Sequence, residues 1–107
     1  MKYVQRINEH AERWELPNGI LHREDGPAFD DIHGNIQYRQ NGVAHRLDGP
    51  AIFRDDGSYD WVINGRYITE QIEFWAETMG IDLDNLTEDD KILISIKWSR
   101  SENTNED

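Results

Sequence analysis

The feature of this chain that most constrains its fold is a tandem repeat of 23 residues. Residues 20–42 align with residues 43–65 without a gap, and nine of the 23 positions are identical. Each copy contains His-Arg-x-Asp-Gly-Pro-Ala and ends in Asn-Gly. A short fixed period usually encodes one supersecondary unit that stacks on its neighbours. We therefore expect an array of similar units.

The glycines of each copy predict two turns. Asn41-Gly42 and Asn64-Gly65 favour the two positive φ angles of a type I′ turn, which joins antiparallel strands. Residues 32–35 and 55–58 each contain another glycine among polar residues, which is a turn composition. Each copy therefore predicts a strand, a turn, a second strand and an Asn-Gly turn that leads into the next motif.

The residues between the turns alternate as β-strands do. Tyr59, Trp61 and Ile63 fall on one face of the predicted strand. Pro27 and Pro50 cannot donate a ladder hydrogen bond, so we expect them at strand starts or bends. The sequence therefore predicts an antiparallel meander of hairpins.

A degenerate first copy is predicted over residues 3–19. Asn18-Gly19 lies one period before the next Asn-Gly, and Trp14 lies one residue from the position that Tyr38 and Trp61 share. The array is thus expected to begin near the N-terminus.

After the last Asn-Gly the chain predicts a helix over residues 70–79. Thr69 offers an N-cap and Gly80 a C-cap, and apolar residues such as Ile72 and Trp75 follow helical spacing. This helix is expected to cover one face of the sheet.

The next segment, residues 88–98, fits two structures. Thr87 and Asp90 resemble a capping box, which favours a helix. The apolar residues from Ile92 to Trp98 also alternate as they would in a strand. The helix is the favoured prediction because a cap precedes an uninterrupted run of suitable length.

The predicted fold class is therefore α+β, an antiparallel β-hairpin repeat meander followed by one or two C-terminal helices. We expect a single domain over residues 1–98, with repeats in 3–68 and a helical cap in 69–98. The composition of residues 99–107 predicts a disordered tail.

At its repeated residues the chain resembles the short tandem HRxDGPA proteins of tailed phages, large viruses and some bacteria. It is similar in spirit to MORN repeats, which are also 23-residue hairpin units. The resemblance covers residues 14–68 and implies a hairpin-repeat fold and a phage or bacterial source, but no activity. The chain lacks the Gly-rich Tyr-x-Gly units of MORN repeats, which argues against lipid binding.

The charge of the chain is uneven. Residues 1–68 carry 11 acids and 8 bases, a balance of −3, whereas residues 69–107 carry 11 acids and 3 bases, a balance of −8. An acidic surface repels nucleic acid and membrane phosphates and favours a basic protein partner. There is no cysteine and no apolar run long enough to span a bilayer, so the cytoplasm is the expected location, that of the host if the source is a phage.

His22 and Asp25 recur as His45 and Asp48, and four such groups could bind a metal or perform acid–base chemistry. Repetition favours a structural role instead, because a catalytic site needs one asymmetric arrangement. We therefore expect no cofactor and no metal. The structural motif residues are His22, Arg23, Asp25, Gly26, Pro27, His45, Arg46, Asp48, Gly49 and Pro50.

Two groups of side chains are candidates for binding a partner. Recurrent aromatic residues form either an exposed stripe or the core, with the core favoured in so short a chain. A cluster of acids lies in the C-terminal third, without the spacing of a calcium loop. The candidates are Trp14, Tyr38, Trp61, Asp82, Asp84, Glu88, Asp89 and Asp90.

Three functions follow as hypotheses. The first is a non-catalytic protein-interaction module, encoded by a phage and binding or inhibiting a host defence or regulatory protein. The second is an acidic DNA mimic that inhibits a nucleic-acid-binding protein. The third is a small metal-dependent or acid–base enzyme that uses the repeated His and Asp residues. A homodimer through a sheet edge is a further expectation.

Overall fold

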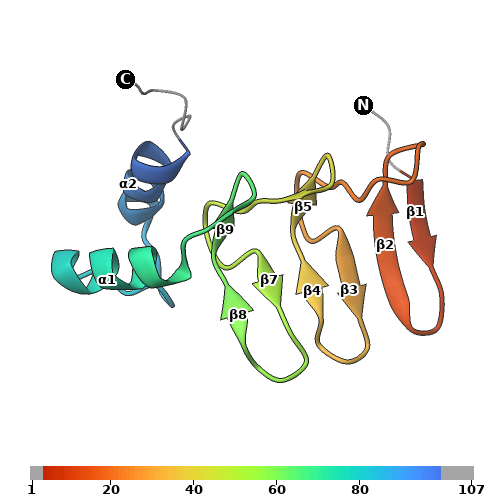
Figure 1. Ribbon diagram of the computed structural model, residues 1–107, viewed down its shortest axis with the longest axis horizontal. Helices are drawn as coiled ribbons and strands as arrows, with labels where there is room; N and C mark the ends of the chain where they lie inside the picture. The colour runs from red at the N-terminus through yellow and green to blue at the C-terminus, as the bar shows by residue number, and fades with distance from the viewer. Residues whose placement is uncertain (1–3, 100–107) are drawn as a thin grey trace.

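The computed structural model describes residues 4–99, which form an elongated array of β-hairpins followed by two helices (Figure 1). This arrangement confirms the predicted α+β class. The elements are β1 (Val4–Ile7), β2 (Ala11–Glu15), β3 (Phe29–Asp31), β4 (Ile36–Gln37), β5 (Arg39–Gln40), β6 (Val43–Ala44), β7 (Ile52–Phe53), β8 (Tyr59–Asp60), β9 (Val62–Ile63), β10 (Arg66–Tyr67), α1 (Thr69–Met79) and α2 (Glu88–Trp98).

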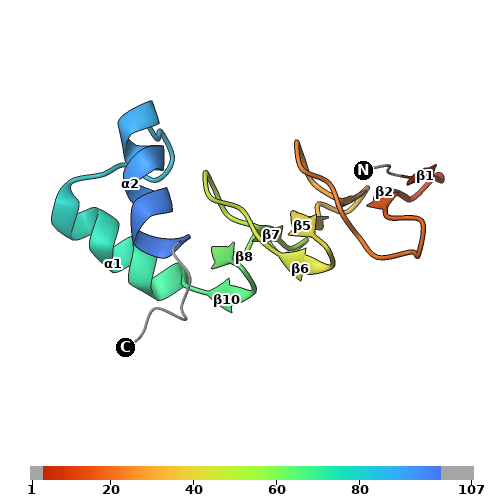
Figure 2. The same cartoon turned by 90° about the horizontal axis from the view of Figure 1, so that it is seen from above.

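The hairpins stand side by side in one antiparallel sheet. Its strand order is β1-β2-β3-β4-β7-β8. At the other end of the units, β5 pairs with β6 and β9 pairs with β10, which makes two short ribbons. Seen from above, the loops that carry the repeated motif rise on one face of the array, and α2 rises on the same face (Figure 2).

The Asn-Gly turns of the two full copies are type I′ turns, as predicted. Asn41 and Asn64 have φ angles of 53° and 52°, and each following glycine is also left-handed. In Asn18-Gly19, however, only the glycine has positive φ. Leu16 N–H donates to the Ile20 carbonyl (2.8 Å) across a loop of three residues. The extra residue in this loop explains why Trp14 is one position out of phase.

Consecutive units are joined by equivalent main-chain hydrogen bonds. Trp14 N–H donates to the carbonyl of Ala28 (2.8 Å), and Tyr38 N–H donates to the carbonyl of Ala51 (2.8 Å). The hairpin of β1 and β2 therefore joins the array in the same way as a full copy does. This geometry confirms the degenerate first copy over its described residues.

The helices follow the predicted order. Thr87 and Asp90 form the reciprocal bonds of a capping box at the start of α2, and Gly80 ends α1 with a φ of 75°. The prediction that Thr69 is an N-cap is wrong. Ile68 occupies that position without a side-chain cap, and Thr69 is the first helical residue.

The predicted tail begins one residue too early. Ser99 ends α2 as its C-cap, and its N–H donates to the carbonyl of Ser95 (2.9 Å). The remainder of that predicted segment, residues 100–107, lies outside the described residues, as do residues 1–3.

The larger core lies between the last unit and the helices. Trp61, Ile63 and Ile68 of the array pack there with Ile72 of α1 and Ile94 of α2. A smaller cluster lies within the array itself and contains Ala44, Ala51, Ile52 and Val62. The helices therefore bury the end of the array and do not cover the whole face of the sheet.

Candidate functional site

The repeated arginine is the centre of each motif. In the second full copy, the Arg46 guanidinium lies 4.0 Å from the centroid of the Tyr38 ring, which belongs to the preceding unit. Its Nε donates to the Asp48 carboxylate (2.9 Å), and its Nη1 donates to the Pro50 carbonyl (3.0 Å). A Cβ at Gly49 would lie 2.7 Å from the Arg46 Cζ. A side chain at residue 49 would therefore displace the guanidinium from this position.

The first full copy repeats this geometry. The Arg23 guanidinium lies 4.2 Å from the Trp14 ring centroid, and Arg23 bonds to Asp25 (3.0 Å) and to the Pro27 carbonyl (3.3 Å). A Cβ at Gly26 would lie 2.9 Å from the same guanidinium carbon. In both copies the arginine therefore bonds to the aspartate and to the proline carbonyl of its own motif. The stacking on the previous unit's aromatic ring makes the arginine a link between units.

The repeated histidines bond to the Asn-Gly turns. The Nδ1 of His22 accepts from the N–H of Asn41 (2.9 Å), and the Nδ1 of His45 accepts from the N–H of Asn64 (2.9 Å). An imidazole that accepts at Nδ1 carries no proton on that nitrogen. Burial lowers the pKa of His45, which favours the neutral form. Each histidine thus ties the start of its own copy to the Asn-Gly turn at the end of that copy.

The four groups considered for metal or acid–base chemistry are thus engaged separately. Each aspartate holds the arginine of its own copy, and each histidine holds a turn. Among the residues 4–99 that the structure describes, no three His, Asp or Glu side chains gather closely enough to hold a metal ion.

The recurrent aromatic side chains do not form an exposed stripe. Trp61 is 1% exposed and lies in the larger core. Trp14 and Tyr38 are partly buried, and the arginine of the following unit covers one face of each ring. The favoured prediction of a core role holds for Trp61, which is removed from the candidate binding residues.

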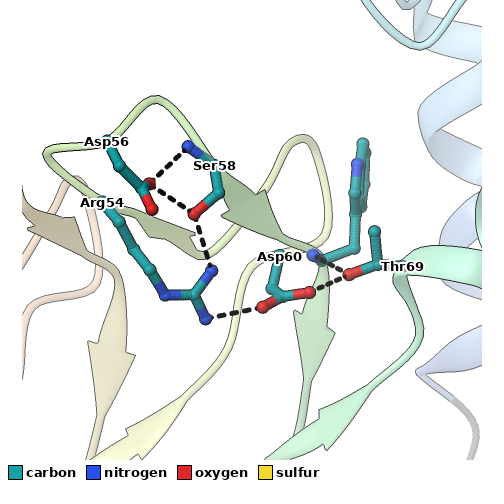
Figure 3. Close-up of polar contacts among 6 residues, drawn as sticks. Arg54, Asp56, Ser58, Asp60 and Thr69 are labelled. Atoms are coloured by element: carbon teal, nitrogen blue, oxygen red, sulfur yellow. Dashed lines mark hydrogen bonds and ion pairs between the residues drawn. The ribbon is translucent and has the colours of Figure 1, made fainter.

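The closing end of the array depends on Thr69 (Figure 3). Trp61 N–H donates to the Thr69 hydroxyl oxygen (2.9 Å), which therefore replaces the alanine carbonyl that accepts this bond in earlier units. The Thr69 hydroxyl donates to Asp60 (2.5 Å), and Asp60 also accepts from Arg54 (2.6 Å). The bonds from Thr69 and Arg54 hold the pKa of Asp60 below its usual range.

Sequence reasoning missed this role of Thr69. Counting one further period from Arg46 reaches residue 69, so Thr69 occupies the position of the repeated arginine. The same count places Ile68 at the position of the repeated histidine. Ile68 N–H donates to the carbonyl of Trp61 (2.8 Å), as His45 N–H does to the carbonyl of Tyr38 (3.0 Å). Extending the alignment past the last Asn-Gly could have found the substitution.

The predicted acidic residues serve two purposes. Asp82 accepts from the Asn85 side chain (3.1 Å) and from the N–H of Asp84 (2.9 Å), and these bonds lower the pKa of Asp82. Asp90 belongs to the capping box of α2. By contrast Asp84, Glu88 and Asp89 are exposed at the surface, with Glu88 3.4 Å from the Lys91 amine.

An apolar stripe lies on the outer side of α2. Ile92, Leu93 and Ile96 are 56%, 40% and 55% exposed, whereas Ile94 on the inner side is fully buried. We call these three exposed residues the α2 stripe. The apolar residues whose alternation resembled a strand in the sequence therefore lie on two different sides of a helix. The sequence analysis did not identify the exposed ones as a candidate site.

A groove of about 600 Å³ runs between α2 and the two motif loops. Its walls include Tyr38, His45, Arg46 and Leu47 on the array and Lys91 and Ile92 on α2. Ile92 thus belongs to both the groove and the α2 stripe, which makes one continuous surface for a partner.

Comparison of the chain with protein-family models, with curated proteins and with solved structures gave no significant match. Neither helix in the described part of the chain is long and apolar enough to cross a membrane.

Proposed function

We propose that this protein is a non-catalytic interaction module that binds a basic protein partner through its helical cap. The observation that carries the proposal is the α2 stripe, an apolar surface on a helix whose first turn carries Glu88, Asp89 and Asp90. A large exposed apolar group rimmed by charge is typical of a protein-binding surface. Burial of such side chains contributes about 1.5–3 kcal/mol for each fully covered residue.

The spacing of the α2 stripe suits insertion into a partner's groove. Ile92 and Ile96 are four residues apart and Leu93 lies between them, so all three project from one side of the helix. An amphipathic helix that binds in a groove uses anchors at such spacing. The groove beside Ile92 gives the partner a second wall to contact.

The charge of the helical cap selects the class of partner. Its described part, residues 69–99, contains eight acids and two bases, a balance of −6. Such a surface speeds association with a basic partner and repels an acidic one. The acids are Glu70, Glu73, Glu77, Asp82, Asp84, Glu88, Asp89 and Asp90, and the bases are Lys91 and Lys97.

The source and location of the partner rest on the sequence resemblance. Tandem HRxDGPA units are typical of phage and bacterial proteins, so the partner is a bacterial defence or regulatory protein in the host cytoplasm. Binding inhibits it by occupying a basic surface.

Affinity capture from a bacterial lysate tests the proposal. The wild-type chain is compared with the double variant Ile92→Asn/Ile96→Asn and with the matched control Ile32→Asn. Ile32 is 64% exposed on the turn between β3 and β4, far from α2. We expect the wild type and the control to retain the same basic protein and the double variant to lose it. Capture that is equal for all three chains would contradict a role for the α2 stripe.

DNA mimicry is the second candidate, and it is favoured by the exposed carboxylates of Asp84, between the helices, and of Glu88 and Asp89, in the first turn of α2. It is tested with Asp84→Asn/Asp89→Asn, because neither side chain belongs to the capping box. A DNA mimic is expected to lose its partner in this variant, in raised salt and in the presence of competing DNA. If the partner binds through the α2 stripe, most of the binding is expected to remain under those conditions and to be lost in the variant Ile92→Asn/Ile96→Asn.

A further inference from the structure

We propose that a second copy of this chain pairs with β1, so that two arrays join edge to edge in a two-fold dimer. This inference is independent of the partner proposed for the helical cap. It follows from a difference in hydrogen bonding between the two edges of the sheet.

The edge at β8 is closed by the chain itself. The N–H of Trp61 would meet the alanine carbonyl of a following unit, but Thr69 accepts its bond instead. Asp60 is held by both Thr69 and Arg54. The helices then pack over Trp61. A second array would have to displace this cap in order to pair at β8.

Among residues 4–99, the outer edge of β1 has no neighbouring strand, so it offers main-chain groups that the sheet does not pair. Asn8 N–H donates to the carbonyl of Ala11 (3.0 Å), and Arg6 lies opposite Arg13 in β2. Hydrogen-bonded positions alternate along an antiparallel strand, so the N–H and C=O groups of Arg6 point toward β2. Those of Gln5 and Ile7 therefore point away from the sheet, where another strand can pair with them.

Natural proteins protect an edge strand by making it short or by adding proline, a bulge or exposed charge. β1 has four residues, which is not short for this sheet, whose inner strands β2, β3, β4 and β7 have five, three, two and two. Its described residues include no proline. Its one charge, on Arg6, is held 2.7 Å from Glu15. The described residues of β1 therefore lack the features that protect an edge strand, and the edge is suited to pairing with another strand.

A second copy fits this edge because the pairing is reciprocal. With a two-fold axis at Arg6, Gln5 of each copy lies opposite Ile7 of the other, and about four hydrogen bonds form. Ile7, which is 69% exposed, is then covered by the neighbouring strand. The bond of Arg6 to Glu15, which Arg13 shares (2.8 Å), keeps the facing arginines partly neutralised.

The charge distribution also favours self-pairing at this end. β1 and the helical cap lie at opposite ends of the longest axis, whose extent is 43 Å (Figure 1). Pairing through β1 therefore keeps the two acidic caps separated by far more than the screening length of about 8 Å at physiological salt. Pairing through the caps would bring them together.

Sedimentation equilibrium and amide hydrogen exchange of the full chain test the dimer. The variant Ile7→Lys places a charge on the edge, and Ile32→Lys is the matched control because Ile32 is exposed on a turn. We expect Ile7→Lys to raise the dissociation constant about tenfold or more and the control to leave it unchanged. We also expect the amides of Gln5 and Ile7 to become protected as the protein concentration rises, whereas Arg6 is protected throughout.

Two results would overturn the proposal. One is a chain that stays monomeric up to about 1 mM, with rapid exchange at Gln5 and Ile7. The other is a dimer that forms equally well with Ile7→Lys and leaves those amides unprotected, since this would place the interface elsewhere. Neither result bears on binding at the α2 stripe, because that binding is measured with the isoleucine variants of α2.

Discussion

The two ends of the repeat array differ in how they satisfy the groups that a further unit would have met. At the C-terminal end, Thr69 accepts the Trp61 N–H, and two helices bury the Trp61 side chain. At the N-terminal end, β1 is an edge strand with its outer residues exposed. Repeat arrays need capping because their units are stable only against neighbours. Within residues 4–99, a full cap covers the end of the array at Trp61, whereas no helix packs on β1.

The difference between the ends begins with the residues that replace the motif. Where earlier units have His-Arg, the closing end has Ile68-Thr69. The isoleucine enters the core, and the threonine hydroxyl replaces a main-chain acceptor. The repeat can therefore be ended by exchanging a turn-binding histidine and a stacking arginine for residues suited to a helix-covered core.

The largest expected effect is the difference in stability between two variants, each of which removes a tryptophan from one end of the array. Trp61→Ala removes a fully buried side chain and is expected to lower the free energy of unfolding by about 3–5 kcal/mol. Trp14→Ala is expected to cost clearly less, because Trp14 is only partly buried and stacks on Arg23. Urea unfolding of both variants measures the difference. Equal losses would show that the two ends contribute alike.

A smaller effect is expected when the closing hydrogen bond is removed. Thr69→Val keeps the shape of the side chain but leaves the buried Trp61 N–H without its acceptor, at a cost of about 1–3 kcal/mol. Thr78→Val is the control, since that exposed hydroxyl bonds only within α1 to the Phe74 carbonyl (3.0 Å). Thermal unfolding of both variants at one concentration checks this. If Thr69→Val were as stable as the control, the hydroxyl would not be what ends the array.

The smallest expected effect is a pH dependence of the free energy of unfolding. It arises at His45 in the repeated motif and not at the closing end. Burial lowers the pKa of His45 from 6.5 in the folded protein, so the unfolded chain binds a proton more readily. The contribution of neutral His45 is complete above pH 6.5 and is lost as the pH falls below that value. Carboxylates with lowered pKa, such as Asp60, act in a lower window, since their contribution is lost only below about pH 3.8.

The variant His45→Asn isolates this effect. An asparagine Oδ1 can accept the Asn64 N–H but does not titrate. We expect it to retain most of the stability at pH 7.5, with a loss no larger than one hydrogen bond, about 0.5–1.5 kcal/mol. The decline in stability between pH 6.5 and pH 5 should become shallower, while the exposed control His33→Asn should leave it unchanged. Urea midpoints measured across that range decide the question, and an unaltered decline in His45→Asn would place its origin elsewhere.

Local chemistry allowed the repeat, the turns and the second helix to be predicted. Asn-Gly favours positive φ at both of its positions, and Thr87 with Asp90 satisfies the first N–H groups of α2. The turns and the start of α2 therefore depend on residues that are close in the sequence. The role of Thr69 was not predicted in the same way. Its local signal suggested an N-cap, but its hydroxyl oxygen accepts from the N–H of Trp61, which lies between β8 and β9, eight residues earlier in the chain.

The candidate site was predicted less completely than the fold. The acidic character of the C-terminal third follows directly from composition, whereas the α2 stripe depends on which residues of the helix face the core. Ile94 is buried and Ile92 and Ile96 are exposed because α2 packs against Trp61 and α1 on one side only. No periodicity in the sequence distinguishes these isoleucines.

The sequence by itself determined the unit, because each turn and each cap is set by residues within a few positions of one another. It also determined the uneven charge, which needs no fold. Only the tertiary structure decided how the units are held together and where the array ends. The arginine stacks on a ring from the preceding unit, and the glycine leaves it room. Such contacts form between residues that are brought together by the fold, so the physical reason for the motif lies between the units and not within them.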